Sequence, residues 1–280
     1  MPVVITALGP HVGVQFTGLT GSELVDNLRA EECLKALDRY GVVIYRDAHI
    51  SDQDLVAFSR LLGDVVANPT GEHELPEIAT ITLDPAKTDP RLAWYREGNF
   101  LWHIDGATDL LPQRATLLTA RQTDPAGGDT EFATTYAAYE LLSEAEKAAI
   151  DDLRVVHSFS AAQRRAHPDA DEKAQAAWAA VPVREHPLVW HRRDGRRSLL
   201  LGATADYVVG WPEQEGRALL DRLLTWCTRP EFTLRHKWHV GDLVIWDNTG
   251  MLHHALPFAP TSLRLMHRTT LVGTEPVAAA

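Results

Sequence analysis

The chain alternates between two hydrophobic patterns, one with the period of a helix and one with the period of a strand. Apolar residues near helical spacing predict helices over about 22–40, from Ser51 onward, and over 213–227. Ser143 and Glu146 form the sequence of a capping box, which marks the start of a further helix. Helices are therefore expected near the N-terminus, in the middle and in the last quarter of the chain.

Between these helices, short apolar runs bounded by turn residues predict strands. The expected strands are two around Gly9-Pro10 within 3–18, then 41–45, 78–83, 117–122, 188–190, 199–201, 232–238 and 243–246. Asp194-Gly195 separates two of these runs and is a strong hairpin signal. Strands dominate from about residue 100 onward. We therefore expect a mainly β fold with flanking helices (α+β), built on a double-sheet jelly roll with the helices packed outside.

Nothing in the middle of the chain has the composition of a linker, because there is no Ser/Gly/Pro run, no block of like charge and no internal repeat. The 280 residues are 45% hydrophobic and 23% charged, which is ordinary for a globular protein with a substantial core. β-rich folds of this length are often one domain, so we expect a single domain over 1–280. Residues 160–180 carry few branched apolar residues, and we expect a mobile insertion there that closes as a lid over the site.

The net charge of −11 argues against a nucleic-acid-binding surface, but not against a small anionic substrate, because a local cluster of arginines can dominate a pocket. Cys33 and Cys227 lie in helix-like patterns, so we expect buried, reduced thiols and no disulfide. No run approaches a transmembrane length, and the N-terminus lacks the basic and apolar regions of a signal peptide. We therefore expect a cytoplasmic protein with no membrane or nucleic-acid partner.

His103 and Asp105 stand one residue apart in the largely apolar stretch 99–106. Side chains of an extended strand alternate between faces, so these two project the same way. They would supply two of the three ligands of a 2-His-1-carboxylate facial triad, which holds Fe(II) and leaves positions open for oxygen chemistry. On this tripeptide alone, a strand with a hydrogen-bonded polar face is the better interpretation, since His-x-Asp is common by chance. A third ligand must come from far along the chain.

Two segments near the C-terminus extend the pattern. One runs from a turn at Gly241 through a short apolar strand to His253 and His254, and the other is an apolar stretch that holds two arginines. With these motifs in order, the chain resembles the TauD/TfdA family of iron(II)/2-oxoglutarate-dependent dioxygenases over nearly its whole length. The motifs lie at 5–10, 99–106, 127–130, 241–255 and 264–273.

The resemblance implies a double-stranded β-helix (cupin-like jelly-roll) core and an Fe(II) site whose ligands are His103, Asp105 and His253. Spacing alone leaves His254 as a rival for the third ligand. The family pattern, in which Trp-Asp-Asn is followed five residues later by the ligand, selects His253. Strand alternation points the nearby Trp246 away from the metal and into the core.

Arg264 and Arg268 lie four residues apart in a strand pattern, which puts both on one face about 13 Å apart. A functional role is a better interpretation of this pair than a surface ion pair, because burying unpaired charge on an apolar strand is costly. By resemblance, Arg264 binds the distal carboxylate of the cosubstrate 2-oxoglutarate in a bidentate contact, and Thr130 assists it. Arg268 matches the family position that holds the acidic group of the prime substrate.

Asn99 and Asn68 match positions of the family's substrate pocket. Around the second position, the family's sulfonate-binding His and a nearby Tyr are replaced by Asn68 and Gly71, which removes a cationic donor and an aromatic wall. This replacement argues against taurine as the substrate. Because Arg268 is kept, we still expect an anionic substrate.

We therefore expect an enzyme that uses Fe(II), 2-oxoglutarate and O2 to hydroxylate a small anionic organic substrate, with release of succinate and CO2. Candidate substrates are sulfonates, sulfate esters, aryloxyalkanoates and amino-acid-like carboxylates. The alternative is a non-catalytic jelly-roll protein that binds a metal and an oxoacid or acts as a sensor. The resemblance also implies a homodimer or homotetramer.

Overall fold

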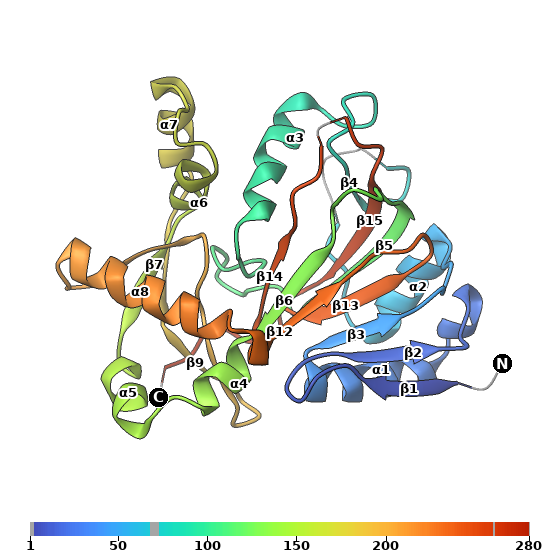
Figure 1. Cartoon of the computed structure of the whole chain (residues 1–280), viewed down its shortest axis with the longest axis horizontal. Coiled ribbons are helices and arrows are strands. Elements are labelled where there is room, and N and C mark those ends of the chain that lie inside the picture. The colour runs from blue at the N-terminus through green and yellow to red at the C-terminus, as the bar shows by residue number, and fades with distance from the viewer. Residues whose placement is uncertain (1–2, 68–72, 260, 280) are drawn as a thin grey trace.

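The computed structural model describes residues 3–67, 73–259 and 261–279. In these ranges the chain combines mixed sheets with helices (α+β), and its largest sheet has seven strands (Figure 1). All neighbouring strands of this sheet are antiparallel except the parallel pair β2–β3. In spatial order the strands are β1 (Val4–Ala7), β2 (Val14–Thr17), β3 (Val42–Tyr45), β13 (Leu243–Asp247), β5 (Ala115–Gln122), β15 (Leu265–Leu271) and β4 (Ala79–Ile81).

A second, three-stranded sheet packs on one face of the first. In spatial order its strands are β12 (Thr233–His236), β6 (Thr130–Thr134) and β14 (Met251–Ala255). Phe132 and Met251 of this sheet share one hydrophobic cluster with Val244 and Trp246 of the first sheet. The two sheets therefore form a sandwich with an apolar interior.

Strand β13 shows why the central strands are apolar on both faces. Val244 and Trp246 face the second sheet, whereas Leu243 and Ile245 belong to a separate cluster beneath two helices. Since side chains alternate along a strand, a strand covered on both sides has a continuous apolar sequence. The covering helices are α1 (Asn27–Tyr40) and α2 (Asp52–Leu62).

The first helix begins later than its apolar pattern predicts. The carboxylate of Asp26 accepts a hydrogen bond from the backbone N–H of Leu28 at 2.9 Å and caps α1, and a separate 3₁₀ turn, η1 (Gly21–Leu24), precedes it. The end of the helix agrees with the prediction, because Gly41 closes it in the left-handed conformation with φ of 69°. The predicted start at 22 is therefore wrong, since a capping side chain interrupts the apolar pattern.

The chain between β6 and β12 builds a second lobe beside the sandwich (Figure 1). Two small sheets, β11-β7-β8 and β10-β9, surround its own apolar cluster. The hairpin predicted at Asp194-Gly195 is confirmed, since β9 and β10 pair antiparallel on either side of it. The elements are α4 (Thr135–Glu140), α5 (Glu144–Ile150), β7 (Arg154–His157), β8 (Arg184–Pro187), β9 (Val189–His191), β10 (Arg197–Leu199), β11 (Ala205–Val208), α8 (Glu213–Cys227) and the 3₁₀ turn η3 (Pro230–Phe232).

Residues 160–180 fold largely as two short helices that dock through aromatic rings. The ring of Trp94 lies 5.5 Å from that of Trp178 and 4.2 Å from that of His167. The elements involved are α3 (Pro90–Arg96), which continues into the 3₁₀ turn η2 (Glu97–Phe100), together with α6 (Phe159–Ala166) and α7 (Glu172–Ala179). The segment expected as a lid is thus packed on the element that leads to His103.

The two cysteines make no disulfide. Cys33 and Cys227 are both buried free thiols, and burial raises the pKa of the Cys33 thiol to about 12. Both thiols are therefore protonated and unreactive at neutral pH. Among the helices described, none is both long and apolar enough to cross a membrane.

Candidate active site

The fold brings together three side chains that the sequence holds far apart. His103 and His253 exchange both backbone hydrogen bonds, at 3.0 and 2.9 Å, in an isolated antiparallel bridge, and their ring centroids lie 4.2 Å apart. Asp105 reaches both rings: its Oδ1 is 3.8 Å from His103 Nε2, and its Oδ2 is 3.6 Å from His253 Nε2. One potential ligand atom of each residue lies within 4.8 Å of the other two. Such a cluster can surround one metal ion.

At neutral pH the three side chains are in the states that bind a metal. Burial lowers the pKa of His103 and lowers that of His253 to about 3, so both rings are neutral. Burial alone would raise the pKa of Asp105, but the charge of Arg268 and that of His253, which is protonated below about pH 3, outweigh burial and lower the pKa of Asp105 to about 2. Neutral imidazoles and an ionised carboxylate are the forms that a divalent cation requires.

A hydrogen bond fixes the tautomer of His103. Its Nδ1 lies 2.8 Å from the carbonyl oxygen of Leu101, to which only a protonated nitrogen can donate. The lone pair of the neutral ring is then on Nε2, the atom that faces Asp105. Two ring nitrogens and one carboxylate fit the donor set of a 2-His-1-carboxylate Fe(II) site, with the non-ligating nitrogen of His103 held by the backbone.

The neighbouring His254 has other partners. Its Nδ1 is 3.2 Å from the carbonyl oxygen of Phe100, and its Nε2 is 3.0 Å from Oε2 of Glu131. Because adjacent residues of a strand face opposite sides, only one of the two histidines can join the cluster. The structure places His253 beside His103 in the ligand cluster, whereas His254 lies outside the cluster and contacts Phe100 and Glu131.

Strand alternation predicted that Trp246 points away from the metal ligands, but its side chain faces them. It lines the pocket, and its ring lies 4.8 Å from that of His253. The predicted core packing of Trp246 is confirmed, because the residue is buried in the cluster between the two sheets. The predicted direction away from the metal ligands is wrong, because His253 belongs to β14 in the second sheet and the alternation of β13 turns Trp246 toward that sheet.

A second group of three potential metal ligands lies beside α2. Asp52 Oδ2 is 3.2 Å from His73 Nε2, and Asp52 Oδ1 is 2.7 Å from His267 Nδ1. The guanidinium of Arg121 also donates to Asp52, so this carboxylate already has a positive partner. His73 accepts a hydrogen bond from the backbone N–H of Leu75 at Nδ1, which leaves its proton, and no lone pair, on Nε2. These residues therefore form an ion-pair network and not a metal site.

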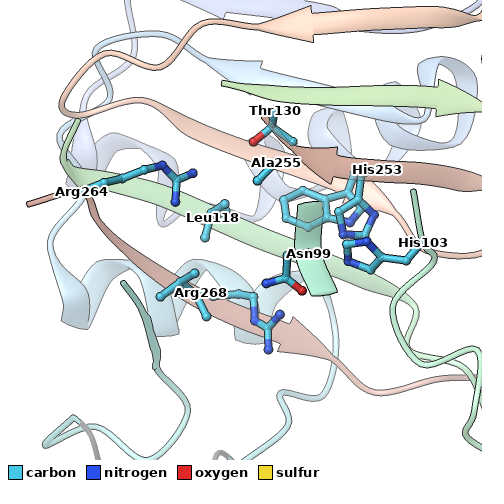
Figure 2. Close-up of a pocket in the computed structure, with 10 residues that line it drawn as sticks. Asn99, His103, Leu118, Thr130, His253, Ala255, Arg264 and Arg268 are labelled. Carbon is cyan, nitrogen blue, oxygen red and sulfur yellow. The ribbon is translucent and has the colours of Figure 1, made fainter. Parts of the chain in front are cut away.

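A pocket opens beside the two histidines, and Figure 2 shows its walls. Six of the eight residues predicted for the site line it, while Asp105 joins them through the metal-ligand cluster. In Figure 2 the side chain of Arg264 enters from the side opposite the histidines. The lining residues are Ile81, Asn99, His103, Leu118, Thr130, Trp246, His253, Ala255, Arg264 and Arg268.

Arg264 is a buried cation that makes no salt bridge within the described ranges. Its side chain is almost inaccessible, its Nε–H donates to the carbonyl oxygen of Gly128 at 3.2 Å, and its guanidinium lies 4.9 Å from the centre of the Phe258 ring. Burial lowers the pKa of Arg264 to about 10, so the group is still charged at neutral pH. Asp129, whose charge acts on it, is already paired with Arg235 at 2.9 Å. A buried cation of this kind favours the binding of an anion.

Arg268, Thr130 and Asn99 present polar groups to the same pocket (Figure 2). Among the residues described, the buried Nε of Arg268 has no hydrogen-bond partner, and its charge acts on Asp105. The hydroxyl of Thr130 accepts a hydrogen bond from the indole N–H of Trp238 at 3.0 Å, which leaves its own proton for a ligand. The pocket thus offers a second cation and two neutral donors.

Sequence reasoning missed two polar residues beside the candidate metal ligands. Thr116 of β5 donates a hydrogen bond to Asp105 Oδ2 at 2.9 Å, and Asn248 Nδ2 donates to Thr116 Oγ1 at 2.8 Å. Asn248 carried a signal, because it belongs to the Trp-Asp-Asn pattern, but Thr116 carried none beyond its polarity in an apolar strand. The predicted pocket residue Asn68, and Gly71 near it, lie outside the described residues.

Comparison with known proteins identifies relatives over the whole chain. The family described as "Taurine catabolism dioxygenase TauD, TfdA family" matches residues 5–270. An alpha-ketoglutarate-dependent 2,4-dichlorophenoxyacetate dioxygenase of Cupriavidus pinatubonensis is 32% identical over 96% of this chain and 98% of the relative. An alpha-ketoglutarate-dependent sulfate ester dioxygenase of Pseudomonas putida is 31% identical over 95% of this chain and 88% of the relative.

Solved structures show the same likeness in three dimensions. The crystal structure of AAD-2 in complex with Mn(II) and N-oxalylglycine superposes with a TM-score of 0.82 at 29% identity, covering 99% of this chain and 100% of that one. A taurine dioxygenase from Burkholderia xenovorans gives a TM-score of 0.79 at 31% identity, covering 98% and 90%. With a family match over most of its length, this chain belongs to the TauD/TfdA family of dioxygenases.

Proposed function

We propose that this dioxygenase uses Fe(II), 2-oxoglutarate and O2 to oxidise a small anionic substrate and releases succinate and CO2. The observation that carries the proposal is a single pocket that joins a His–carboxylate–His cluster to two arginines near the start and middle of one strand. The relatives named above are alpha-ketoglutarate-dependent dioxygenases, which favours an enzyme over a non-catalytic binding protein or sensor.

His103, Asp105 and His253 would hold the Fe(II). Bound there, the metal supplies the redox chemistry that couples O2 to an oxoacid. The chain's own part is to keep three ligand atoms close together and to hold His103 in one tautomer through the Leu101 carbonyl. Because both histidines line the pocket, molecules that enter it arrive beside the metal ligands.

Arg264 and Thr130 would bind the distal carboxylate of 2-oxoglutarate. The Nε–H of Arg264 is taken by Gly128, and its terminal nitrogens make no hydrogen bond to the described residues, so they suit a bidentate contact with a carboxylate. The free proton of Thr130 can be donated to the same group. A bound carboxylate would also neutralise a charge that is otherwise buried alone.

Arg268 would hold the acidic group of the prime substrate, with Asn99 and, by resemblance, Asn68 beside it. Ile81 and Leu118 add aliphatic wall to the pocket near these polar groups. An aryloxyalkanoate or a sulfate ester matches this combination, because each joins one anionic group to an apolar body. The two curated relatives are named for these substrate classes. We therefore place both classes ahead of sulfonates and amino-acid-like carboxylates.

The architecture and assembly are proposed on the same basis. The seven-stranded and three-stranded sheets would form the double-stranded β-helix core of the family, within a single domain over 1–280. Residues 160–180 would move away from α3 as substrate enters and return as a lid. We further propose a cytoplasmic enzyme that forms a homodimer or homotetramer.

The test is succinate formation by the full chain with Fe(II), 2-oxoglutarate and O2. The panel contains 2,4-dichlorophenoxyacetate, an alkyl sulfate, taurine and an N-alkyl amino acid, each with and without O2. We expect O2-dependent stimulation by an aryloxyacid or sulfate ester, and none by taurine. A protein that binds 2-oxoglutarate but forms no succinate under any condition would contradict the proposal and support the sensor alternative.

A further inference from the structure

Two buried residues form a chain of hydrogen bonds that ends on the candidate metal ligand Asp105. We propose that Thr116 and Asn248 are positioning residues that hold the Asp105 carboxylate in its metal-binding orientation. This inference rests on the metal role proposed for Asp105 in the preceding section. Asn248, the last residue of the Trp-Asp-Asn pattern, would thereby act directly in positioning a metal ligand.

The contacts are short and lie away from solvent. Thr116 Oγ1 is 2.9 Å from Asp105 Oδ2, and Asn248 Nδ2 is 2.8 Å from Thr116 Oγ1. Thr116 and Asn248 are both completely buried. Within the described ranges, Thr116 is the one residue that donates a hydrogen bond to the Asp105 side chain. The carboxylate orientation therefore depends on this hydroxyl more than on any other polar contact.

The direction of each hydrogen bond follows from the carboxylate. A carboxylate that binds a cation is ionised and can only accept, so Thr116 must donate its single proton to Asp105. The Thr116 oxygen can then only accept from Asn248, which must present its NH2 group. The other end of that amide, Oδ1, is buried and has no hydrogen-bond partner among the residues described. Because an unsatisfied buried carbonyl is costly, its presence here indicates that Asn248 is held for its donor.

Both residues are fixed by the backbone of the large sheet. Thr116 lies opposite Trp246 in the antiparallel pairing of β5 with β13. The backbone N–H of Asn248 donates to the carbonyl oxygen of Arg114 at 3.1 Å. The side chains of Arg114 and Asp247 form an ion pair at 2.7 Å. A shift of Asn248 would therefore break its backbone hydrogen bond to Arg114 and disturb the neighbouring ion pair of Asp247 with the same residue.

The decisive experiment is a titration of the metal-free full chain with Mn(II) by isothermal calorimetry at saturating 2-oxoglutarate. Thr116→Val keeps the shape of the side chain and removes the donor, and we expect an Mn(II) affinity about tenfold weaker, in the range typical for groups that orient metal ligands. Thr116→Ser restores the hydroxyl and should recover most of the affinity. Thr119→Val is the matched control, because Thr119 is also completely buried in β5 and its hydroxyl has no partner among the residues described.

A double-mutant cycle tests whether Asn248 acts through Thr116. Asn248→Ala should weaken Mn(II) binding in the wild-type background and have no further effect on Thr116→Val. Thermal unfolding shows whether each variant is folded. If Thr116→Val does not fold, the Mn(II) affinity of Asn248→Ala still tests the positioning role.

Wild-type affinity in Thr116→Val, or equal losses in Thr116→Val and Thr119→Val, would overturn the positioning role. An additive loss in the double variant would overturn the proposed link between Asn248 and Thr116. Wild-type Mn(II) affinity in Asp105→Ala is a different result, because it would overturn the proposed metal site itself. The failure of the inference and the failure of the proposed function are therefore distinguishable.

Discussion

His253 and His254 are neighbours in β14, but their side chains contact different partners. The ring of His253 lies 4.2 Å from that of His103, whereas Nε2 of His254 lies 3.0 Å from the carboxylate of Glu131. The pair offers an internal control for metal binding, because one residue belongs to the candidate ligand cluster and the other, next to it, does not.

Replacing His253 by Ala should weaken Mn(II) binding by about 100-fold or more, since a lost ligand costs at least as much as a lost group that orients a ligand. His254→Gln keeps a polar group near Glu131 and should change the affinity little. Calorimetric titration with Mn(II) measures both. Equal losses in the two variants would contradict the assignment of His253.

Arg264→Lys should raise the KM for 2-oxoglutarate about tenfold or more, because a lysine cannot make the bidentate contact of a guanidinium. The KM for the prime substrate should stay close to that of the wild type. Arg235→Lys is the control, since Arg235 forms a partly exposed ion pair with Asp129 near the same pocket end. An unchanged KM for 2-oxoglutarate in Arg264→Lys would argue against this role.

Arg268→Gln should separate the two halves of the reaction. Stimulation of succinate formation by the prime substrate should fall by about 30-fold or more, because a buried charge pair with the substrate is lost. Slow succinate formation without substrate, and the KM for 2-oxoglutarate, should remain. Steady-state kinetics with and without substrate give both values, and full stimulation at an unchanged substrate KM would exclude the proposed contact.

Two buried threonines should respond in opposite directions to loss of their hydroxyls. Thr119 Oγ1 has no partner among the described residues, so Thr119→Val should raise the free energy of unfolding by about 1 kcal/mol. Ser59 donates its hydroxyl proton to the carbonyl oxygen of Leu55, so Thr269 donates the 2.7 Å hydrogen bond that joins it to Ser59. Thr269→Val should lower that free energy by about 1 kcal/mol, because this buried hydrogen bond is lost. Urea unfolding of both variants measures the difference, and changes of the same sign would contradict the hydrogen-bond assignment.

His157 should make the fold sensitive to acid. Burial lowers its pKa from 6.5 to about 3, so the unfolded chain binds a proton more readily than the folded one. Its contribution to stability is complete above about pH 6.5 and is lost as the pH falls toward 3, by up to about 1.4 kcal/mol per unit. His157→Asn should therefore lose less stability than the wild type between pH 6.5 and 4.5 in urea unfolding. An identical pH dependence in both proteins would contradict the burial argument.

The sequence predicts the central strands well because their physical cause is local. β3 and β13 are covered on both faces, so continuous apolar runs at 41–45 and 243–246 mark them. Helix α3 was not predicted, because Trp94 packs on His167, just after α6, and on Trp178 of α7, and these ring contacts leave no amphipathic stripe to detect. Its existence depends on partners that lie far away in the sequence.

The candidate site also combines residues that local sequence predicts with residues that only the folded structure reveals. The sequence correctly predicts that His103 and Asp105 lie close together, since 3.8 Å separates His103 Nε2 from Asp105 Oδ1. The strand expected over 99–106 is wrong, because the 3₁₀ turn η2 ends at Phe100, His103 makes an isolated bridge with His253, and Asp105 lies in a turn. The choice of His253 required either the family pattern or the pairing of β14 with β6, and the contact between Thr116 and Asp105 required the full fold. Long-range contacts of this kind leave no periodic signal in the sequence.

Whether His103, Asp105 and His253 form the iron site is tested by comparing O2-dependent succinate formation by the wild type and by Asp105→Ala, with Fe(II), 2-oxoglutarate and the best substrate of the panel. We expect the wild type to form succinate only with O2 and the folded variant to form none, because the variant has lost the carboxylate of the metal-ligand cluster. Succinate formation by Asp105→Ala at the wild-type rate would contradict the claim that this pocket is the iron site.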